Sequence, residues 1–347
     1  MGQVRPSIGV DIGGTKVLAA VVDETGRVLD TESTATPGPG SGVDNATVEE
    51  VEDALVEVVG RLIAQYGRLT VGVAAAGFVA RDGERVRFAP HLPWRDEPLA
   101  QRLGKRLGPG ALGRVMVEND ATAALWAEAR FGAAQDTPDS LMITLGTGIG
   151  GALVVRGMLT RGTNGMAGEF GHMMVVPDGR PCECGRRGCW EQYCSGRALT
   201  RAAVEAGSVL SGPALTSAAR DGDPAAAAAY IEVGRWLGVG IANLVAALDP
   251  SLVVVGGGAS SAGDLLLEPA REALAQNLVG AGHRDLPEVV EAVLGPLAGV
   301  VGAADLARVA SRPSRVGRRG RAPSRVARKR AGTTSAKRRA RREGPSP

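Results

Sequence analysis

The feature that most constrains the fold is a unit of strand, glycine-rich turn and strand that occurs twice in the chain. The first unit joins apolar runs at 7–10 and 17–22 through Asp11-Ile12-Gly13-Gly14-Thr15-Lys16. The second joins 141–145 and 152–155 through Gly146-Thr147-Gly148-Ile149-Gly150-Gly151. Glycines leave the backbone N–H groups of such turns free to face an anion. Two such turns predict two related halves that grip a polyphosphate from both sides of a cleft.

The side chains of the first turn fit the same interpretation. Thr15 adds a hydroxyl donor, Lys16 adds a cation, and the Asp11 carboxylate can hold Mg²⁺ through water. The Walker A spacing is absent, and no helix follows the turn. A plain hairpin turn with positive φ remains the alternative for this segment.

A third glycine turn, Gly256-Gly257-Gly258, follows the apolar run 252–255. Ligands of α/β sheets bind at the carboxyl ends of strands, so close backbone approach here would suit a nucleoside. The alternative interpretation is a turn that packs a helix against the sheet.

Strands alternate with helices along the first 310 residues, which indicates an α/β fold. A length of 347 residues suits two domains. Apolar runs predict strands at 7–10, 17–22, 28–34, 69–76, 115–117, 141–145, 152–155, 252–255 and 288–292. Helical periodicity or Ala-rich composition predicts helices at 48–66, 98–107, 120–131, 198–206, 214–219, 224–248, 262–277 and 302–310.

Three of the four cysteines, Cys182, Cys184 and Cys189, fall within eight positions, and His172 lies ten residues before the first of them. Thiolates with one imidazole are the ligand set of a closed tetrahedral zinc site. Cysteines separated by one residue pair poorly as disulfides, so zinc is favoured over a disulfide loop. The fourth cysteine, Cys194, lies outside the pattern and is expected to be a buried free thiol.

Polar residues around this cluster indicate that it shapes a binding site. Glu169 precedes His172, and Glu191 follows Cys189. A metal that only stabilised a loop would not need these carboxylates. Together with His172, they could fix the hydroxyl groups of a sugar.

Asp120 is the candidate general base. It follows the short strand 115–117 and begins a helix, so its alternative role is as an N-cap. Phosphoryl transfer requires positioning, charge neutralisation and one acceptor for the proton of the attacking hydroxyl. Asn119 offers both a donor and an acceptor to a ligand that carries hydroxyl groups.

These motifs together resemble the ROK family of sugar kinases and sugar-responsive repressors, over residues 8–310. The resemblance rests on five segments: 11–16, Glu118-Asn119-Asp120, 145–151, Gly168-Glu169-Phe170-Gly171-His172, and the cysteine segment 182–191. It implies two actin-like (ribonuclease-H-like) domains that close over sugar and ATP. The first is residues 1–118, completed by a helix at about 297–311, and the second is residues 119–296 with the zinc-binding loop.

The resemblance also implies residue roles. Asp120 would be the catalytic base. Substrate contacts would come from Gly77, His91, Asn119, Glu169, His172 and Glu191. A structural Zn²⁺ would be held by His172, Cys182, Cys184 and Cys189. ATP and Mg²⁺ would be held by Asp11, Gly13, Gly14, Thr15, Lys16, Gly146, Thr147, Gly148, Gly256, Gly257 and Gly258.

The expected reaction is ATP-dependent phosphorylation of the 6-hydroxyl of glucose to glucose 6-phosphate. The segment His91-Leu92-Pro93-Trp94 is similar to glucose-specific members from high-GC bacteria, and His91 stands where relatives often carry Asn. Residues 13–16 resemble ATP users rather than polyphosphate users. N-acetylmannosamine, N-acetylglucosamine and fructose are the alternative substrates.

The competing hypothesis is a non-catalytic, sugar-sensing regulator. Repressors of the family carry a helix-turn-helix domain before the first glycine turn. Here that turn begins at Asp11, which leaves no room for such a domain. The resemblance to the family also implies a homo-oligomer, either a dimer or a tetramer.

Charge separates the end of the chain from the rest. Of 40 Lys and Arg residues, 14 lie beyond Ser311 with one acidic residue, which leaves 26 basic and 36 acidic residues before it. Residues 312–347 are predicted to be a disordered basic tail that binds polyanions weakly. The amino terminus lacks a signal-peptide core, and no long uncharged apolar run occurs, so a cytoplasmic protein without a membrane span is expected.

Overall fold

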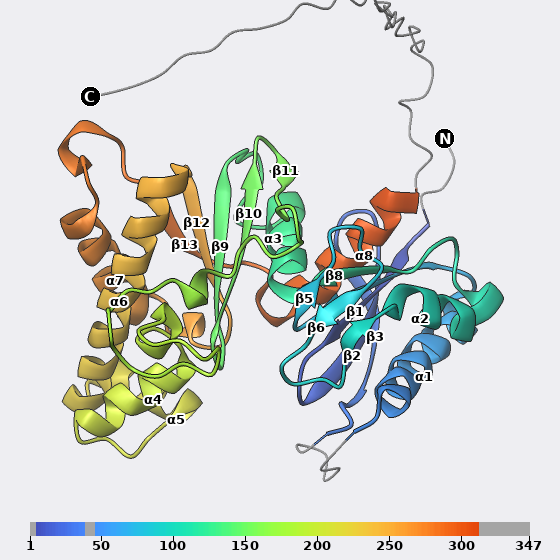
Figure 1. Ribbon diagram of the computed structural model, residues 1–347, viewed down its shortest axis with the longest axis horizontal. Coiled ribbons are helices and arrows are strands. Elements are labelled where there is room, and N and C mark those ends of the chain that lie inside the picture. Colours follow the sequence, from blue (N-terminus) through green and yellow to red (C-terminus); the bar gives the residue numbers. More distant parts are fainter. Residues whose placement is uncertain (1–4, 39–45, 312–347) are drawn as a thin grey trace, which may run out of the picture. The chain divides into compact units, whose positions relative to one another are not determined.

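The computed structural model describes residues 5–38 and 46–311 (Figure 1), and the predicted basic tail lies outside these residues. Its strands form two five-stranded sheets and one three-stranded sheet. The strands and helices alternate along the chain, which confirms the predicted α/β class.

The first sheet has the order β3-β2-β1-β4-β8. Its strands are β1 (Ser7–Ile12), β2 (Lys16–Val22), β3 (Val28–Ala35), β4 (Thr70–Ala75) and β8 (Met116–Asn119). The hairpin β1–β2 is antiparallel, and β1, β4 and β8 run parallel. The candidate residues Asp11 and Asn119 therefore lie at the carboxyl ends of parallel strands, where ligands of α/β sheets bind.

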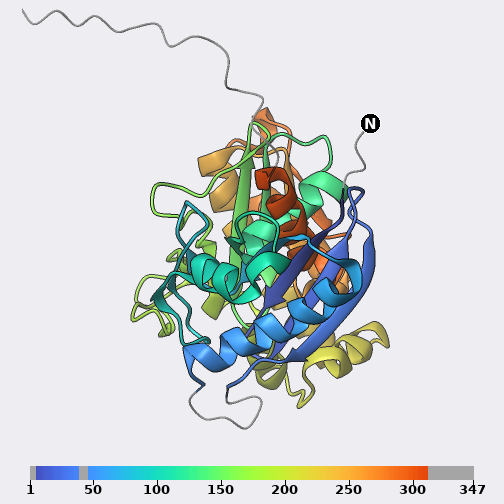
Figure 2. The same ribbon diagram turned by 90° about the vertical axis from the view of Figure 1, so that its right-hand side faces the viewer.

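Helices from both ends of the chain pack on this sheet. Helix α1 (Val48–Tyr66) lies across the strands of this sheet (Figure 2). It begins with a capping box between Thr47 and Glu50 and buries an apolar stripe. The last helix, α8 (Ala298–Ser311), contacts β1 and β4 so closely that a Cβ on Gly9 or Gly72 would overlap its backbone. Its start matches the expected helix at about 297–311 and lies four residues before the narrower range 302–310. Helix α2 is Leu99–Leu107.

The second sheet repeats the first, with the order β11-β10-β9-β12-β13. Its strands are β9 (Ser140–Leu145), β10 (Ile149–Val155), β11 (Met158–Leu159), β12 (Leu252–Gly256) and β13 (Glu288–Glu291). The β9–β10 hairpin is antiparallel, and β9, β12 and β13 run parallel. The repeated strand–turn–strand unit read from the sequence is therefore a repeated sheet topology.

The helices of the second half share a hydrophobic core with this sheet. They are α4 (Gly196–Glu205), α5 (Gly212–Arg220), α6 (Pro224–Leu248) and α7 (Asp264–Asn277). Helix α3 (Asp120–Phe131) follows β8 and contacts both β10 and α8. The indole N–H of Trp126 on α3 donates to Asp305 on α8 at 2.8 Å.

Sequence periodicity missed the smallest sheet, β5 (Phe78–Val79), β6 (Val86–Phe88) and β7 (Arg95–Glu97). Strands of two or three residues are too short to show an alternating pattern. This sheet carries the segment between Gly77 and Arg95, which includes His91.

Helix α6 is the one helix of the described chain that could cross a membrane by length and composition, with a mean hydropathy of 1.4 over its most apolar window. Half of that window is buried, and α6 contacts α4, α5 and α7. The core helix of a soluble protein meets the same criteria, so the finding is weak evidence for a membrane span.

Candidate active site

The turn from β8 into α3 presents the candidate base. Asn119, not Asp120, is the N-cap, because its Oδ1 accepts from Thr122 N at 3.0 Å. Asp120 Oδ1 accepts from Ala121 N and from Asn119 Nδ2, each at 2.9 Å. Its Oδ2 has no hydrogen-bond partner among the described residues. Because Asn119 is the N-cap, the capping alternative for Asp120 is excluded. Burial raises the pKa of Asp120.

Two further carboxyl groups interact electrostatically with Asp120. Burial raises the pKa of Asp11 to about 7, and the charge of Asp120 adds to the shift. Burial also raises the pKa of Glu169 to about 7, with contributions from Asp120 and Glu191. A cation or hydroxyl donors would relieve this concentration of negative charge.

The structure brings the four predicted metal ligands together. The ligand atoms of His172, Cys182, Cys184 and Cys189 all lie within 4.8 Å of one another. Cys182 Sγ is 3.7 Å from His172 Nδ1, and Cys184 Sγ is 3.6 Å from Cys189 Sγ. Zn–S bonds of about 2.3 Å in a tetrahedron place ligands roughly 3.8 Å apart, so this donor set fits Zn²⁺.

The ring orientation of His172 is also informative. Its Nδ1 faces the thiols, so Nε2 is the nitrogen left for another partner. The short helical turns Phe170–His172 and Trp190–Gln192 hold the two ends of the cysteine segment, and Trp190 is fully buried.

Glu191 connects the cysteine segment with the second glycine turn. Its Oε1 lies 3.3 Å from Cys182 Sγ and 4.0 Å from His172 Nδ1. Its Oε2 lies 3.5 Å from Ile149 N, and a Cβ on Gly148 would be 2.5 Å from that oxygen. The absence of a side chain at Gly148 therefore leaves room for the Glu191 carboxylate.

The first glycine turn lies against His91. A Cβ on Gly14 would be 3.3 Å from the Cβ of His91. The turn is closed by Gly13 N donating to Lys16 O at 3.2 Å and by the Thr36 hydroxyl donating to Gly13 O at 2.8 Å. Gly77 joins the site through its carbonyl, which accepts from Asn119 Nδ2 at 3.1 Å.

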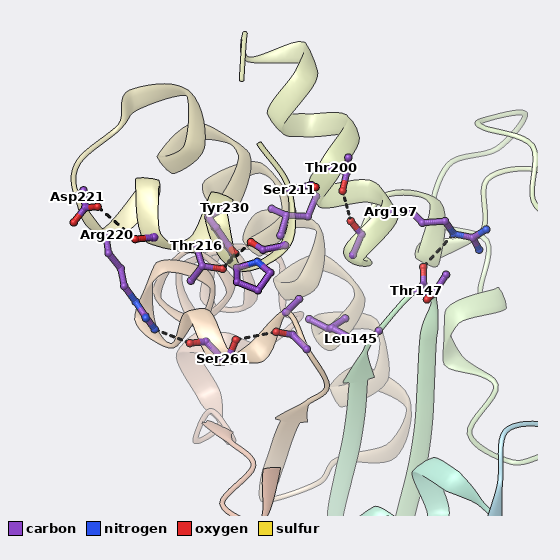
Figure 3. A pocket seen from close by; sticks show the side chains of 18 residues that line it. Leu145, Thr147, Arg197, Thr200, Ser211, Thr216, Arg220, Asp221, Tyr230 and Ser261 are labelled. Carbon is purple, nitrogen blue, oxygen red and sulfur yellow. Dashed lines mark hydrogen bonds between the residues drawn. The ribbon is translucent and has the colours of Figure 1, made fainter. Parts of the chain in front are cut away.

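The second and third glycine turns border a cavity of about 780 Å³ (Figure 3). Gly146, Thr147 and Gly258 line it, whereas Gly256 and Gly257 do not. Gly257 has φ +88°, and a Cβ there would lie 2.6 Å from the backbone of Leu145. The close contact of Gly257 is with strand β9 and not with a helix, so it does not support the helix-packing alternative; Gly258 lines the cavity, as the ligand interpretation expects.

Helices α4, α5 and α6 supply cavity residues that sequence reasoning missed. Arg197 Nε donates to Thr147 O at 3.1 Å, Thr216 Oγ1 lies 2.8 Å from the Tyr230 hydroxyl, and Arg220 donates to Ser261 O at 2.7 Å (Figure 3). These residues stand in Ala-rich helices without a motif. No sequence pattern identifies these residues as cavity residues. The fold reveals them, because it brings the helices beside the glycine turns.

Comparison with known proteins agrees with this architecture. The family model described as ROK family matches residues 7–310. The two sheets of repeated topology have the actin-like α/β fold of sugar-kinase structures, and the chain belongs to the ROK family.

Individual relatives cover most of the chain. The chain is 43% identical over 320 residues to a glucokinase of Streptomyces coelicolor, covering 87% of this chain and 97% of the relative. A ROK glucokinase from Streptomyces griseus, solved in complex with glucose and AMPPNP, is 45% identical with a TM-score of 0.78, covering 88% and 99%. A ROK hexokinase from Thermus thermophilus is 35% identical with a TM-score of 0.69, covering 86% and 96%.

Proposed function

We propose that this protein is an ATP-dependent glucokinase, which transfers the γ-phosphoryl group of ATP to the 6-hydroxyl of glucose. The observation that carries the proposal is the environment of Asp120. Its Oδ1 is fixed by two donors, its Oδ2 is free to accept a proton, and its pKa is raised by burial. The similarity to the Streptomyces glucokinases supports glucose and ATP as substrates.

In this proposal Asp120 accepts the proton of the attacking hydroxyl as the phosphoryl group is transferred. Asn119, Glu169, His172, Glu191, Gly77 and His91 form the sugar site. Hydrogen bonds from the hydroxyl groups of the sugar would offset the desolvation of Glu169. The Nε2 atom of His172 is the ring nitrogen available to the sugar.

The glycine turns hold the nucleotide. Gly13 N and Gly146 N close the turns by donating to Lys16 O and Gly148 O, so the backbone N–H groups of Gly14, Thr15, Thr147 and Gly148 are those that would face the phosphates. Lys16 would contribute positive charge, and Asp11 would hold Mg²⁺ through water. The cavity beside Gly146, Thr147 and Gly258 accommodates the nucleoside.

His172, Cys182, Cys184 and Cys189 would hold a structural Zn²⁺. When bound, it supplies fixed geometry to the segment 172–191 rather than a reactive group. Because Glu191 lies two residues after Cys189, in the turn Trp190–Gln192, an ordered cysteine segment would also order the backbone that carries this carboxylate. The zinc site thereby prepares one wall of the sugar site.

The proposal also covers the domains, the oligomeric state and the cellular location of the protein. Residues 1–118 with α8 form one domain, and residues 119–296 form the other. Separate hydrophobic clusters on the two sheets support this division. We further propose a cytoplasmic homo-oligomer that acts in glycolysis. Light scattering of the purified protein will report whether it is a dimer or a tetramer.

The reaction is tested by the identity of its product. The protein is incubated with glucose and Mg-ATP, and ³¹P and ¹³C NMR spectra are recorded. The expected result is one phosphate monoester on carbon 6. Transfer to another carbon, or sugar binding without transfer, would reject the proposal and favour the sensing role.

A further inference from the structure

One ion pair links the turn that carries the candidate base with the segment that carries Glu169. Arg161 follows β11, and its Nε and Nη2 atoms lie 2.6 and 2.5 Å from Glu118 Oε2. Glu118 is the residue before Asn119 and is 6% exposed. Its second oxygen, Oε1, accepts from Asn119 N at 3.1 Å. The guanidinium group and the backbone of the catalytic turn therefore share one carboxylate.

The segment after Arg161 is tightly constrained up to Glu169. Arg161 O accepts from Ala167 N at 3.1 Å, which closes a loop two residues before Glu169. Gly165 lies against the backbone of Val79 on β5, and Gly168 lies against Gly151 on β10, each too closely for a side chain. The segment from Arg161 to Glu169 therefore has little conformational freedom, and the ion pair of Arg161 ties its first residue to Glu118.

We propose that Arg161 is a positioning residue that, through Glu118, fixes Glu169 relative to Asn119 and Asp120 and so sets selectivity among hexoses. The inference rests on the proposed function. Neither side chain of the ion pair is assigned to the sugar. Their effect is geometric, since one oxygen of Glu118 accepts from Asn119 N, next to Asp120, and the other pairs with Arg161 at the start of the segment that leads to Glu169.

A purely structural ion pair would give a different result from a positioning one. Loss of folded protein lowers the turnover of every sugar by the same factor, so the ratio of two kcat/KM values does not change. Misplacement of Glu169 weakens the contacts of some hydroxyl groups more than others. The ratio of kcat/KM for glucose to that for mannose, which differs at one hydroxyl, therefore separates the two roles.

The variants follow from the geometry. Arg161→Gln removes the charge, whereas Arg161→Lys keeps the charge but loses the two-nitrogen contact. Glu118→Gln has a single side-chain oxygen in place of two, so it cannot give separate acceptors to Asn119 N and to Arg161. We expect glucose KM to rise, and the selectivity for glucose over mannose to fall, in the order wild type, Arg161→Lys, Arg161→Gln.

Two controls match these changes. Arg61→Gln removes an exposed ion pair to Glu32, at 2.9 Å, on α1 and β3. Leu62→Ala destabilises the core of the same helix, where Leu62 is 1% exposed. Both should keep the selectivity ratio of the wild type, the second despite a lower Tm.

The experiment measures kcat and KM for glucose, mannose and ATP, and glucose affinity by calorimetry, in all these variants. For Arg161→Gln we expect glucose KM to rise and the glucose-to-mannose ratio to fall by on the order of 10-fold to 100-fold. The KM for ATP should stay within about threefold of wild type. A selectivity ratio equal to that of Leu62→Ala would overturn the inference.

Failure of the proposed function would look different. A wild-type protein that binds glucose but transfers no phosphate would reject the kinase, while the calorimetric comparison would still test Arg161. Unchanged relative affinities for glucose and mannose in Arg161→Gln would then overturn the positioning role. Lower affinity for glucose alone would support it.

Discussion

Substitution of Asp120 by Asn separates binding from turnover. The amide retains Oδ1, which can still accept from Ala121 N and Asn119 Nδ2, each at 2.9 Å in the structure. The amide nitrogen replaces Oδ2, the oxygen available for the proton. General-base catalysis contributes roughly 10²–10⁴-fold, so kcat should fall by that factor, or about 3–5 kcal/mol in the barrier.

The same substitution should not destabilise the fold. Burial raises the pKa of Asp120, so the ionised carboxylate destabilises the folded state above the pKa of the unfolded chain. A neutral amide removes this penalty at pH 8. The Tm of Asp120→Asn should therefore equal or exceed that of wild type.

The assay combines steady-state kinetics, glucose titration by calorimetry and thermal melting at pH 8. Asp285→Asn, at an exposed position before β13, is the control and should match wild type in all three. A kcat for Asp120→Asn within a few-fold of wild type would show that Asp120 is not the base. Loss of glucose binding would show that Asp120 acts mainly by binding the substrate rather than by accepting its proton.

Three further substitutions test other parts of the site. Cys184→Ala should lose zinc by metal analysis and raise the glucose KM, whereas Cys194→Ala should keep its zinc; an unchanged metal content would remove Cys184 from the ligand set. Asp11→Asn should raise the Tm without Mg²⁺, and the gain should grow as pH rises from 3.8 towards about 7, because the folded-state pKa of this acid is raised above its unfolded value. A pH-independent Tm difference would contradict that cause. Gly148→Ala would place a Cβ 2.5 Å from Glu191 Oε2, so glucose KM should rise by about 10-fold. Gly60→Ala, with open space around it in α1, is its control, and equal KM values would reject this role of Glu191.

Sequence patterns were sufficient to predict the elements that depend on interactions between residues close together in the chain. The helices Val48–Tyr66 and Pro224–Leu248 begin and end where apolar periodicity and Ala-rich composition predict. In the second turn, glycine is required at Gly148, where the Glu191 carboxylate comes close, and at Gly151, where Gly168 O does, whereas a Cβ on Gly13 or Gly146 would meet nothing within 4 Å. Thr15 and Thr147 lie in these turns, and Lys16 is the first residue of β2; their roles toward a nucleotide remain predictions.

The rest depends on contacts that are distant in the chain. Arg161 has no motif, and its significance comes from Glu118, 43 residues earlier. The cavity residues of α5 and α6 are brought to Thr147 only by packing of the helices. The distinction between Gly257 and Gly258 also requires the structure, because only the approach of Leu145 shows which of them packs against backbone.

The central claim is tested most directly by a coupled assay of hexose phosphorylation. Glucose, N-acetylmannosamine, N-acetylglucosamine and fructose are each offered with Mg-ATP and with polyphosphate, in protein shown to contain zinc. The account predicts a strong preference for glucose with ATP. Preference for another sugar would keep the mechanism and change the substrate, whereas no transfer with any pair would contradict the assignment as a kinase.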